Sequence, residues 1–159
     1  MPLKFWKTIF RLWFLVSYLI TAVPILKHLF QAETKGNYKN ELDLDCANGV
    51  GAIAAKGFMK VLEVVGPQAL KINIYSDNIK NDQLLNLNCG ADFVKVQQKS
   101  PESLPGTELR RCVSFDGDAD RVVYYYTDGD KIFHLLDGDR IATLSKFYDP
   151  RVQWKILNY

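Results

Sequence analysis

The sequence predicts an α/β domain with a mixed sheet and flanking helices. Strand-like and helix-like patterns alternate over residues 41–75, which is typical of parallel strands joined by a crossover helix. After residue 112, two apolar runs are separated by a T-D-G-D turn, and Asp128-Gly129 there indicates a tight type I′ hairpin between antiparallel strands. A sheet that contains both kinds of connection is mixed.

In the first half, the elements follow from apolar spacing and from glycine. The run ELDLDC predicts a strand, and the ANGVGA stretch predicts a glycine turn that opens a helix. This helix should run from about Gly51 to Val65, because Gly66 and Pro67 stop it. We expect five apolar residues on its buried face: Ile53, Ala54, Phe58, Val61 and Leu62. The alternating run ALKINIYSD predicts a second strand.

The second half contains the same kinds of pattern. NDQLLNLNCGADFVKV predicts a short helix closed by Gly90 and then a brief strand at about Phe93 to Val96. CVSF predicts a short buried strand, and VVYYYT and KIFHLL predict the two hairpin strands, with alternate rings of the tyrosine run facing the core. DGDRIATLSKFY predicts a final helix capped by Asp137 or Asp139.

The amino-terminal segment differs in composition from the rest. An uncharged run from Leu12 to Leu26 follows several basic residues, as in a signal peptide. The run is shorter than the roughly 20 residues that a membrane span needs, and Pro24 interrupts it. We therefore expect no membrane association, and we divide the chain into an apolar helical segment with a linker (1–40), the α/β domain (41–150) and a tail (151–159).

Charge and cysteine usage exclude several classes of function. The formal net charge of +2 is small and evenly spread, which argues against a nucleic-acid partner. The three cysteines, Cys46, Cys89 and Cys112, form no CxxC pair, which argues against a zinc site or a disulfide framework. We expect buried thiols in a reducing compartment, and hence a cytoplasmic protein.

The stretch SFDGDADR, residues 114–121, carries the chemistry. It places Asp116, Asp118 and Asp120 at alternate positions directly after an apolar run, where mutual repulsion is unfavourable unless a cation neutralises it. An EF-hand is excluded, because its sixth and twelfth positions, which require glycine and glutamate, hold Arg121 and Thr127.

Three interpretations of this loop remain. A phosphatase-like aspartate nucleophile would need a lysine and a further acidic pair downstream, which the chain does not visibly supply. A solvated acidic turn is a second alternative. We favour a Mg²⁺ site, in which an extended loop points the three carboxylates to one side and Arg121 offsets their charge or holds a phosphate.

Two other features have more ordinary interpretations. Asn48, Gly49 and Gly51 form a turn whose N–H groups could bind an anion, but we favour a purely structural role for the glycines. His134 lies in a strand pattern, and we expect it to be a hydrogen-bonded partner and not a catalyst.

The segments CVSFDGDADRVVYYY and LLDGDRIATL resemble the metal-binding loop of the α-D-phosphohexomutase superfamily, and more narrowly that of the phosphoacetylglucosamine mutases. LDCANGVGA and LNCGADFVK are similar to that family at similar spacing. The resemblance covers about Leu42 to Phe147. It implies a fold like the second domain of a phosphohexomutase.

The resemblance also implies a function and a set of site residues. In that family, Mg²⁺-dependent phosphoryl transfer interconverts the 6- and 1-phosphates of N-acetylglucosamine, for UDP-N-acetylglucosamine biosynthesis. The substrate would be a hexosamine phosphate. The metal ligands would be Asp116, Asp118 and Asp120, and Arg121 would be the catalytic residue beside the metal.

Departures from the family pattern limit what this chain could do alone. The T-A-S-H-N-P-like loop that carries the family's phosphoserine is absent, as are the family's sugar loop and its arginine-rich phosphate loop. We therefore expect a fragment that covers mainly the second domain, is inactive by itself and works with the missing domains of the same enzyme. The alternative is a non-catalytic metal- or phosphate-binding module derived from a phosphohexomutase.

Overall fold

The computed structural model describes residues 40–66, 69–106 and 108–148. The chain divides into two compact units, one formed by residues 1–40 and 56–71 and the other by residues 41–55 and 72–159. The predicted amino-terminal helix and the predicted tail lie outside the described residues. Among the helices that are described, none has the length and apolar character needed to cross a membrane.

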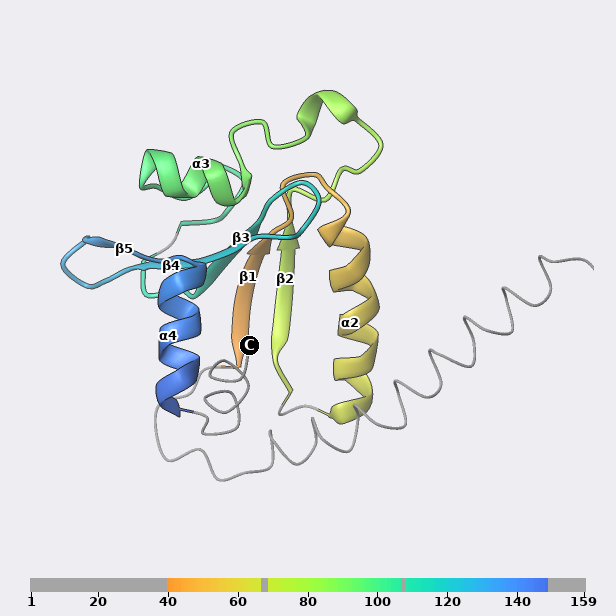
Figure 1. The fold of residues 1–159 in the computed structure, drawn as a ribbon. Coiled ribbons are helices and arrows are strands. Elements are labelled where there is room, and N and C mark those ends of the chain that lie inside the picture. The colour runs from red at the N-terminus through yellow and green to blue at the C-terminus, as the bar shows by residue number, and fades with distance from the viewer. Residues whose placement is uncertain (1–39, 67–68, 107, 149–159) are drawn as a thin grey trace, which may run out of the picture. The chain divides into compact units, whose positions relative to one another are not determined.

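Within the described residues, five strands form one sheet in the order β2-β1-β3-β4-β5. Their bounds are β1 Glu41–Asp45, β2 Lys71–Tyr75, β3 Cys112–Phe115, β4 Val122–Thr127 and β5 Phe133–Leu136. β1 and β3 are parallel, with Asp45 opposite Ser114, whereas β3 pairs with β4 and β4 with β5 in antiparallel fashion. The predicted mixed sheet is confirmed, and the loops after β1 and β3 meet at one edge of it (Figure 1).

Helix α2 (Gly51–Val65) has the predicted bounds, but part of its predicted buried face is wrong. Ile53 is 58% exposed and Ala54 is also exposed, whereas Ala52 and Ala55 are buried. A β-carbon at Gly51 would lie 2.8 Å from the Phe115 ring, so the first turn lies too close to β3 for a large inward side chain. Small residues therefore face inward there.

The segment between β2 and β3 differs more strongly from the prediction. A short 3₁₀ helix covers Asp82–Leu84, and helix α3 covers Gly90–Gln97, so Gly90 begins a helix and the predicted strand at Phe93 to Val96 is helical. The reason is tertiary: Gly90 has a φ of +89° and donates its N–H to the buried carboxylate of Asp45 at 2.7 Å. Ala91 and Val94 then face the core.

The core of the second unit lies between α3 and strands β3 and β4. Its buried members are Ala91, Val94, Leu104, Cys112, Val123 and Tyr125. Tyr125 is fully buried while Tyr124 and Tyr126 are half-buried, which confirms the predicted alternation of the tyrosine run. The expectation of buried free thiols is confirmed for all three cysteines.

The hairpin between β4 and β5 is not the predicted type I′ turn. Asp128 donates its N–H to the Ile132 carbonyl at 3.1 Å, and Lys131 takes a left-handed φ of +63°. This is the pattern of a three-residue loop, in which the last loop residue is left-handed. His134 stacks on Tyr126 and hydrogen-bonds through Nε2 to Asp128 Oδ2 at 2.7 Å, which confirms its predicted role as a partner.

Helix α4 (Gly138–Tyr148) begins after Asp137. Of the two predicted caps, Asp137 is the one used: its Oδ1 accepts the Arg140 N–H at 3.3 Å, and its carbonyl accepts the Ile141 N–H at 2.9 Å. The carboxylate thereby satisfies one of the free N–H groups of the first turn.

Candidate metal centre

The acidic loop after β3 is folded and not extended, which corrects the predicted loop geometry. Ala119 takes a left-handed φ of +62° and donates its N–H to the Asp116 carbonyl at 3.1 Å, closing a tight turn. One carboxylate oxygen each from Asp116, Asp118 and Asp120 nevertheless lies within 4.8 Å of the others. Asp116 is buried and the other two are exposed, so the cluster opens to solvent.

Glycine makes the close approach of two loops possible. A β-carbon at Gly49 would lie 2.1 Å from the Gly117 carbonyl oxygen, which accepts the Val50 N–H at 3.0 Å. Asn48 uses its side chain within the protein, donating to the Leu84 carbonyl at 3.0 Å and accepting the Asn78 N–H at 3.1 Å. These contacts support the structural interpretation of the Asn48–Gly51 turn over an anion site.

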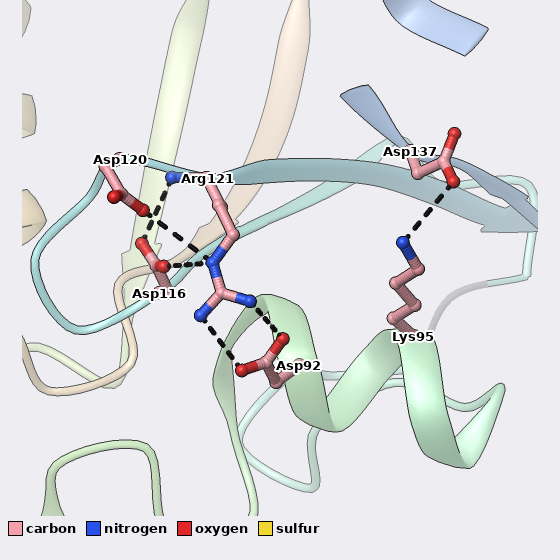
Figure 2. A network of polar contacts seen from close by, with 6 residues as sticks. All are labelled: Asp92, Lys95, Asp116, Asp120, Arg121 and Asp137. Carbon is pink, nitrogen blue, oxygen red and sulfur yellow. Dashed lines mark hydrogen bonds and ion pairs between the residues drawn. The ribbon is translucent and has the colours of Figure 1, made fainter. Parts of the chain in front are cut away.

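Arg121 connects the acidic loop to helix α3 (Figure 2). Its Nε donates to Asp116 Oδ2 at 2.6 Å, and its backbone N–H donates to Asp116 Oδ1 at 3.2 Å. Nη2 donates to Asp92 Oδ2 at 2.9 Å, while Nη1 donates to the second oxygen of the same carboxylate. The Nε atom also lies 3.7 Å from Asp120 Oδ1. Arg121 thus places a positive charge against the carboxylates of the loop.

These contacts shift the pKa values of Asp116 and Asp120 in opposite directions. Burial would raise the pKa of Asp116, but the hydrogen bonds from Arg121 outweigh it and hold the pKa below its ordinary value. The hydrogen bond with Asp116 and the repulsion from Asp118 raise the pKa of Asp120. Asp116 is thus a charged carboxylate at neutral pH, and it lies in a cluster of oxygen donors of the kind that Mg²⁺ binds.

Beneath the loop lies a buried carboxylate that the sequence analysis missed. Asp45 is fully buried, and among the described residues its oxygens accept three donors: the Ala47 N–H at 3.0 Å, the Gly90 N–H at 2.7 Å and the Ser114 hydroxyl at 2.8 Å. The Ser114 hydroxyl also hydrogen-bonds to the Tyr125 hydroxyl at 3.0 Å. Asp45 therefore fixes the end of β3, from which the acidic loop begins, against the start of α3.

A second buried carboxylate lies on the same strand. Asp43 is 2% exposed and accepts Arg110 Nη2 at 2.8 Å and Asn73 Nδ2 at 2.9 Å. Burial alone would raise the pKa of Asp43, but the Arg110 and Asn73 hydrogen bonds lower it overall. The available sequence signal was the alternation of the ELDLD strand, which places acidic residues at 41, 43 and 45 and leucines between them.

A cavity of about 510 Å³ opens beside the acidic loop, and α3 forms one wall of it. Its charged lining consists of Asp92, Lys95, Asp120, Arg121, Asp137 and Asp139. Lys95, one turn after Asp92 on α3, lies 3.6 Å from the Asp137 carboxylate (Figure 2). The same face of α3 thus contacts both the acidic loop and the start of α4.

Comparison with known proteins identifies the family. Residues 13–123 match the family described as phosphoacetylglucosamine mutase AMG1, domain II. The chain belongs to the phosphoacetylglucosamine mutase family. The family match begins at residue 13, closer to the amino terminus than the Leu42 from which we expected the resemblance to run, and it includes the strand, glycine turn and acidic loop described above.

Curated relatives agree with this assignment. The chain is 49% identical over 114 residues to phosphoacetylglucosamine mutase from Sus scrofa, covering 72% of this chain and 20% of the relative. It is 39% identical over 139 residues to the enzyme of the same name from Saccharomyces cerevisiae, covering 86% and 25%. The chain therefore spans about a fifth to a quarter of the length of these relatives.

Solved structures show the same fold. Aspergillus fumigatus N-acetylphosphoglucosamine mutase in complex with GlcNAc-6P and magnesium matches with a TM-score of 0.63 and 42% identity, over 80% of this chain and 25% of that one. An N-acetylglucosamine-phosphate mutase of the α-D-phosphohexomutase superfamily, in the product complex, matches with a TM-score of 0.68 and 34% identity, over 82% and 24%. The predicted phosphohexomutase domain-2-like fold is confirmed.

Proposed function

We propose that this chain supplies the Mg²⁺-binding part of a phosphoacetylglucosamine mutase, which interconverts N-acetylglucosamine 6-phosphate and 1-phosphate for UDP-N-acetylglucosamine biosynthesis. The observation that carries the proposal is the convergence of Asp116, Asp118 and Asp120 in a chain that belongs to this family. The magnesium and GlcNAc-6P in the Aspergillus fumigatus complex support the choice of metal and of substrate class.

The proposed roles follow from burial and charge. Asp116, Asp118 and Asp120 hold the ion, with the buried Asp116 as the ligand most firmly fixed and the other two at the solvent-facing side. Bound Mg²⁺ neutralises the oxygens of the phosphoryl group in transfer. Arg121, which contacts Asp116, is the catalytic residue beside the metal: it balances the remaining negative charge and presents a cation toward phosphate.

Metal binding by the 159-residue chain is tested by calorimetry with MgCl₂. We expect Asp118→Asn to weaken binding by about tenfold or more, because a neutral amide replaces a charged ligand oxygen. Asp130→Asn, at an exposed aspartate of the β4–β5 hairpin, is the matched control and should bind like the wild type. Equal heats for wild type and Asp118→Asn would contradict the assigned ligands.

The catalytic part of the proposal needs groups that this sequence does not contain. No T-A-S-H-N-P run occurs in the 159 residues, so we propose that the chain alone has no mutase activity. The second candidate is a non-catalytic metal- or phosphate-binding module derived from a phosphohexomutase. A coupled assay on N-acetylglucosamine 6-phosphate distinguishes them: turnover restored by adding the other domains of a family member supports the mutase, while Mg²⁺ binding without restored turnover supports the module.

Sugar preference and location are further parts of the proposal. We propose a preference for N-acetylglucosamine phosphates over glucose phosphates, measured as relative turnover of the reconstituted enzyme; a strong preference for glucose 1-phosphate would contradict it. We also propose a cytoplasmic location, consistent with the free thiols. Recovery of a carboxy-terminally tagged chain in a carbonate-washed membrane pellet would contradict that location.

A further inference from the structure

Arg121 contacts the acidic loop through one edge of its guanidinium and helix α3 through the other (Figure 2). We propose that Asp92 is a positioning residue for Arg121: it holds the guanidinium in an orientation that leaves the ligand oxygens of the acidic loop available to a divalent cation. The proposal deepens the metal-binding role given above and rests on it. It concerns a residue whose sequence context, a polar position on a short helix, gives no hint of the role.

The geometry of the Asp92–Arg121 pair is that of a two-pronged contact. Both terminal nitrogens of Arg121 donate to the two oxygens of Asp92, with Nη2 to Oδ2 at 2.9 Å. Such a paired arrangement fixes the plane of the guanidinium, which a single hydrogen bond does not. Nε is then the nitrogen that is left to face the acidic loop, and it donates to Asp116.

The helix that carries Asp92 is itself held in place. Asp92 lies in the first turn of α3, and the N–H of Gly90 at the start of that helix donates to the buried carboxylate of Asp45. Asp45 also accepts the Ser114 hydroxyl, from the strand that ends in the acidic loop. The start of the helix that carries Asp92 and the strand that leads into the loop are therefore hydrogen-bonded to the same buried carboxylate, which holds the two backbone segments next to each other.

Without Asp92, the guanidinium would compete with a cation. Its Nε lies 2.6 Å from Asp116 Oδ2 and 3.7 Å from Asp120 Oδ1, so it is already among the proposed ligand oxygens. If the two terminal nitrogens lost their acceptors, they could turn onto Asp116 and Asp120 and form the two-pronged contact there. The cation would then have to displace Arg121 from both carboxylates.

Calorimetry with MgCl₂ on the full chain tests this competition. We expect Asp92→Asn to weaken Mg²⁺ binding by about two- to five-fold, the range that corresponds to an exposed ion pair. Asp139→Asn removes the same charge from an exposed position in the same cavity, at a residue that is not one of the carboxylates ion-paired to Arg121 in the described part of the chain, and should have little effect. In an Arg121→Gln background, Asp92→Asn should have no further effect, because no guanidinium remains to be positioned.

A simple loss of charge near the metal would give a different result. It would weaken binding equally in the Asp92→Asn and Asp139→Asn variants, and equally with and without Arg121. Either result, or unchanged binding in Asp92→Asn, would overturn the proposal.

An NMR measurement tests the positioning without any metal. The Arg121 Nε–H resonance, assigned by its loss in Arg121→Gln, should show the relaxation of a fixed group in the wild type and that of a mobile group in Asp92→Asn. Unchanged relaxation in Asp92→Asn would overturn the role of Asp92. Absence of Mg²⁺ binding by the wild type, with a mobile Arg121 in the variant, would instead contradict the proposed metal function and leave the positioning of Arg121 by Asp92 supported.

Discussion

Replacing Asp45 by asparagine tests whether the buried carboxylate supports the metal loop. Its two oxygens accept the Ala47 and Gly90 N–H groups and the Ser114 hydroxyl. An asparagine side chain offers one acceptor oxygen and one amino group. The Ser114 hydroxyl can turn fully to Tyr125, 3.0 Å away, but at least one of the two backbone N–H groups would then face another donor.

The expected loss of stability follows from the number of hydrogen bonds that asparagine cannot make at position 45. An unsatisfied buried donor costs about 1–3 kcal/mol, and the loss of a hydrogen bond to a charged group costs about 1.5–3 kcal/mol. Because some relaxation is available, we expect Asp45→Asn to lower the free energy of unfolding by about 2–4 kcal/mol. With a urea m-value of about 2 kcal/mol/M, the midpoint of unfolding should fall by about 1–2 M.

The assay is urea unfolding of the full chain, followed by far-ultraviolet circular dichroism. Asp130→Asn makes the same chemical change at an exposed position and should stay within about 0.5 kcal/mol of the wild type. Ser114→Ala keeps both backbone donors of the carboxylate but removes the hydroxyl that pairs with the buried Tyr125 hydroxyl, so it should itself cost about 1–3 kcal/mol. An Asp45→Asn variant as stable as the Asp130→Asn control would refute the reasoning.

Three further predictions concern other contacts. Gly49→Ala should weaken Mg²⁺ binding in calorimetry and lower the unfolding midpoint, because its β-carbon would lie 2.1 Å from a carbonyl oxygen of the acidic loop; wild-type affinity would contradict this. Burial raises the pKa of Cys89 to about 11 and that of Cys112 to about 12, so at pH 8 Ellman's reagent should react with these thiols in urea but hardly in the native chain. Arg110→Met should destabilise the fold by about 1–3 kcal/mol at pH 7. This is less than the cost of removing one partner of a fully buried ion pair, because the Arg110 side chain is 38% exposed. The pKa of Asp43 is lowered in the folded chain, so the ionised carboxylate stabilises the fold above its ordinary pKa of 3.8, and this stabilisation is lost as the pH falls through the lower folded value. Arg110→Met should therefore begin to unfold in acid at a higher pH than the wild type. Coincident acid transitions of the two proteins would count against a stabilising role of the Asp43–Arg110 pair.

The acidic loop shows what sequence can and cannot predict. Alternating carboxylates after an apolar run were sufficient to locate the candidate ligands, because their mutual repulsion requires a local explanation. The folded turn was not predictable, since it depends on a left-handed φ at Ala119, a conformation that residues with a β-carbon rarely adopt. Packing between the acidic loop and the Asn48–Gly51 turn holds the loop in this folded conformation, and no local sequence pattern indicates that packing.

Helix α3 was mispredicted for a related reason. A glycine between two stretches that mix apolar and polar residues can end one helix or begin the next, and the sequence near Gly90 is compatible with both. The N–H donated to Asp45 decides between them, and that carboxylate lies on a strand far away in the chain. The contact of Asp92 with Arg121 is likewise non-local, so it could not be found from spacing.

The contact between Gly49 and the acidic loop has a consequence for how this family can vary in length. The two loops share a backbone hydrogen bond and leave no room for a β-carbon, so an inserted residue in either one would displace the other. The tip of the β4–β5 hairpin is different: a β-carbon at Gly129 would meet open space, and Asp130 beside it is exposed. Relatives should therefore gain and lose residues at that tip while keeping the length of both loops at the metal edge.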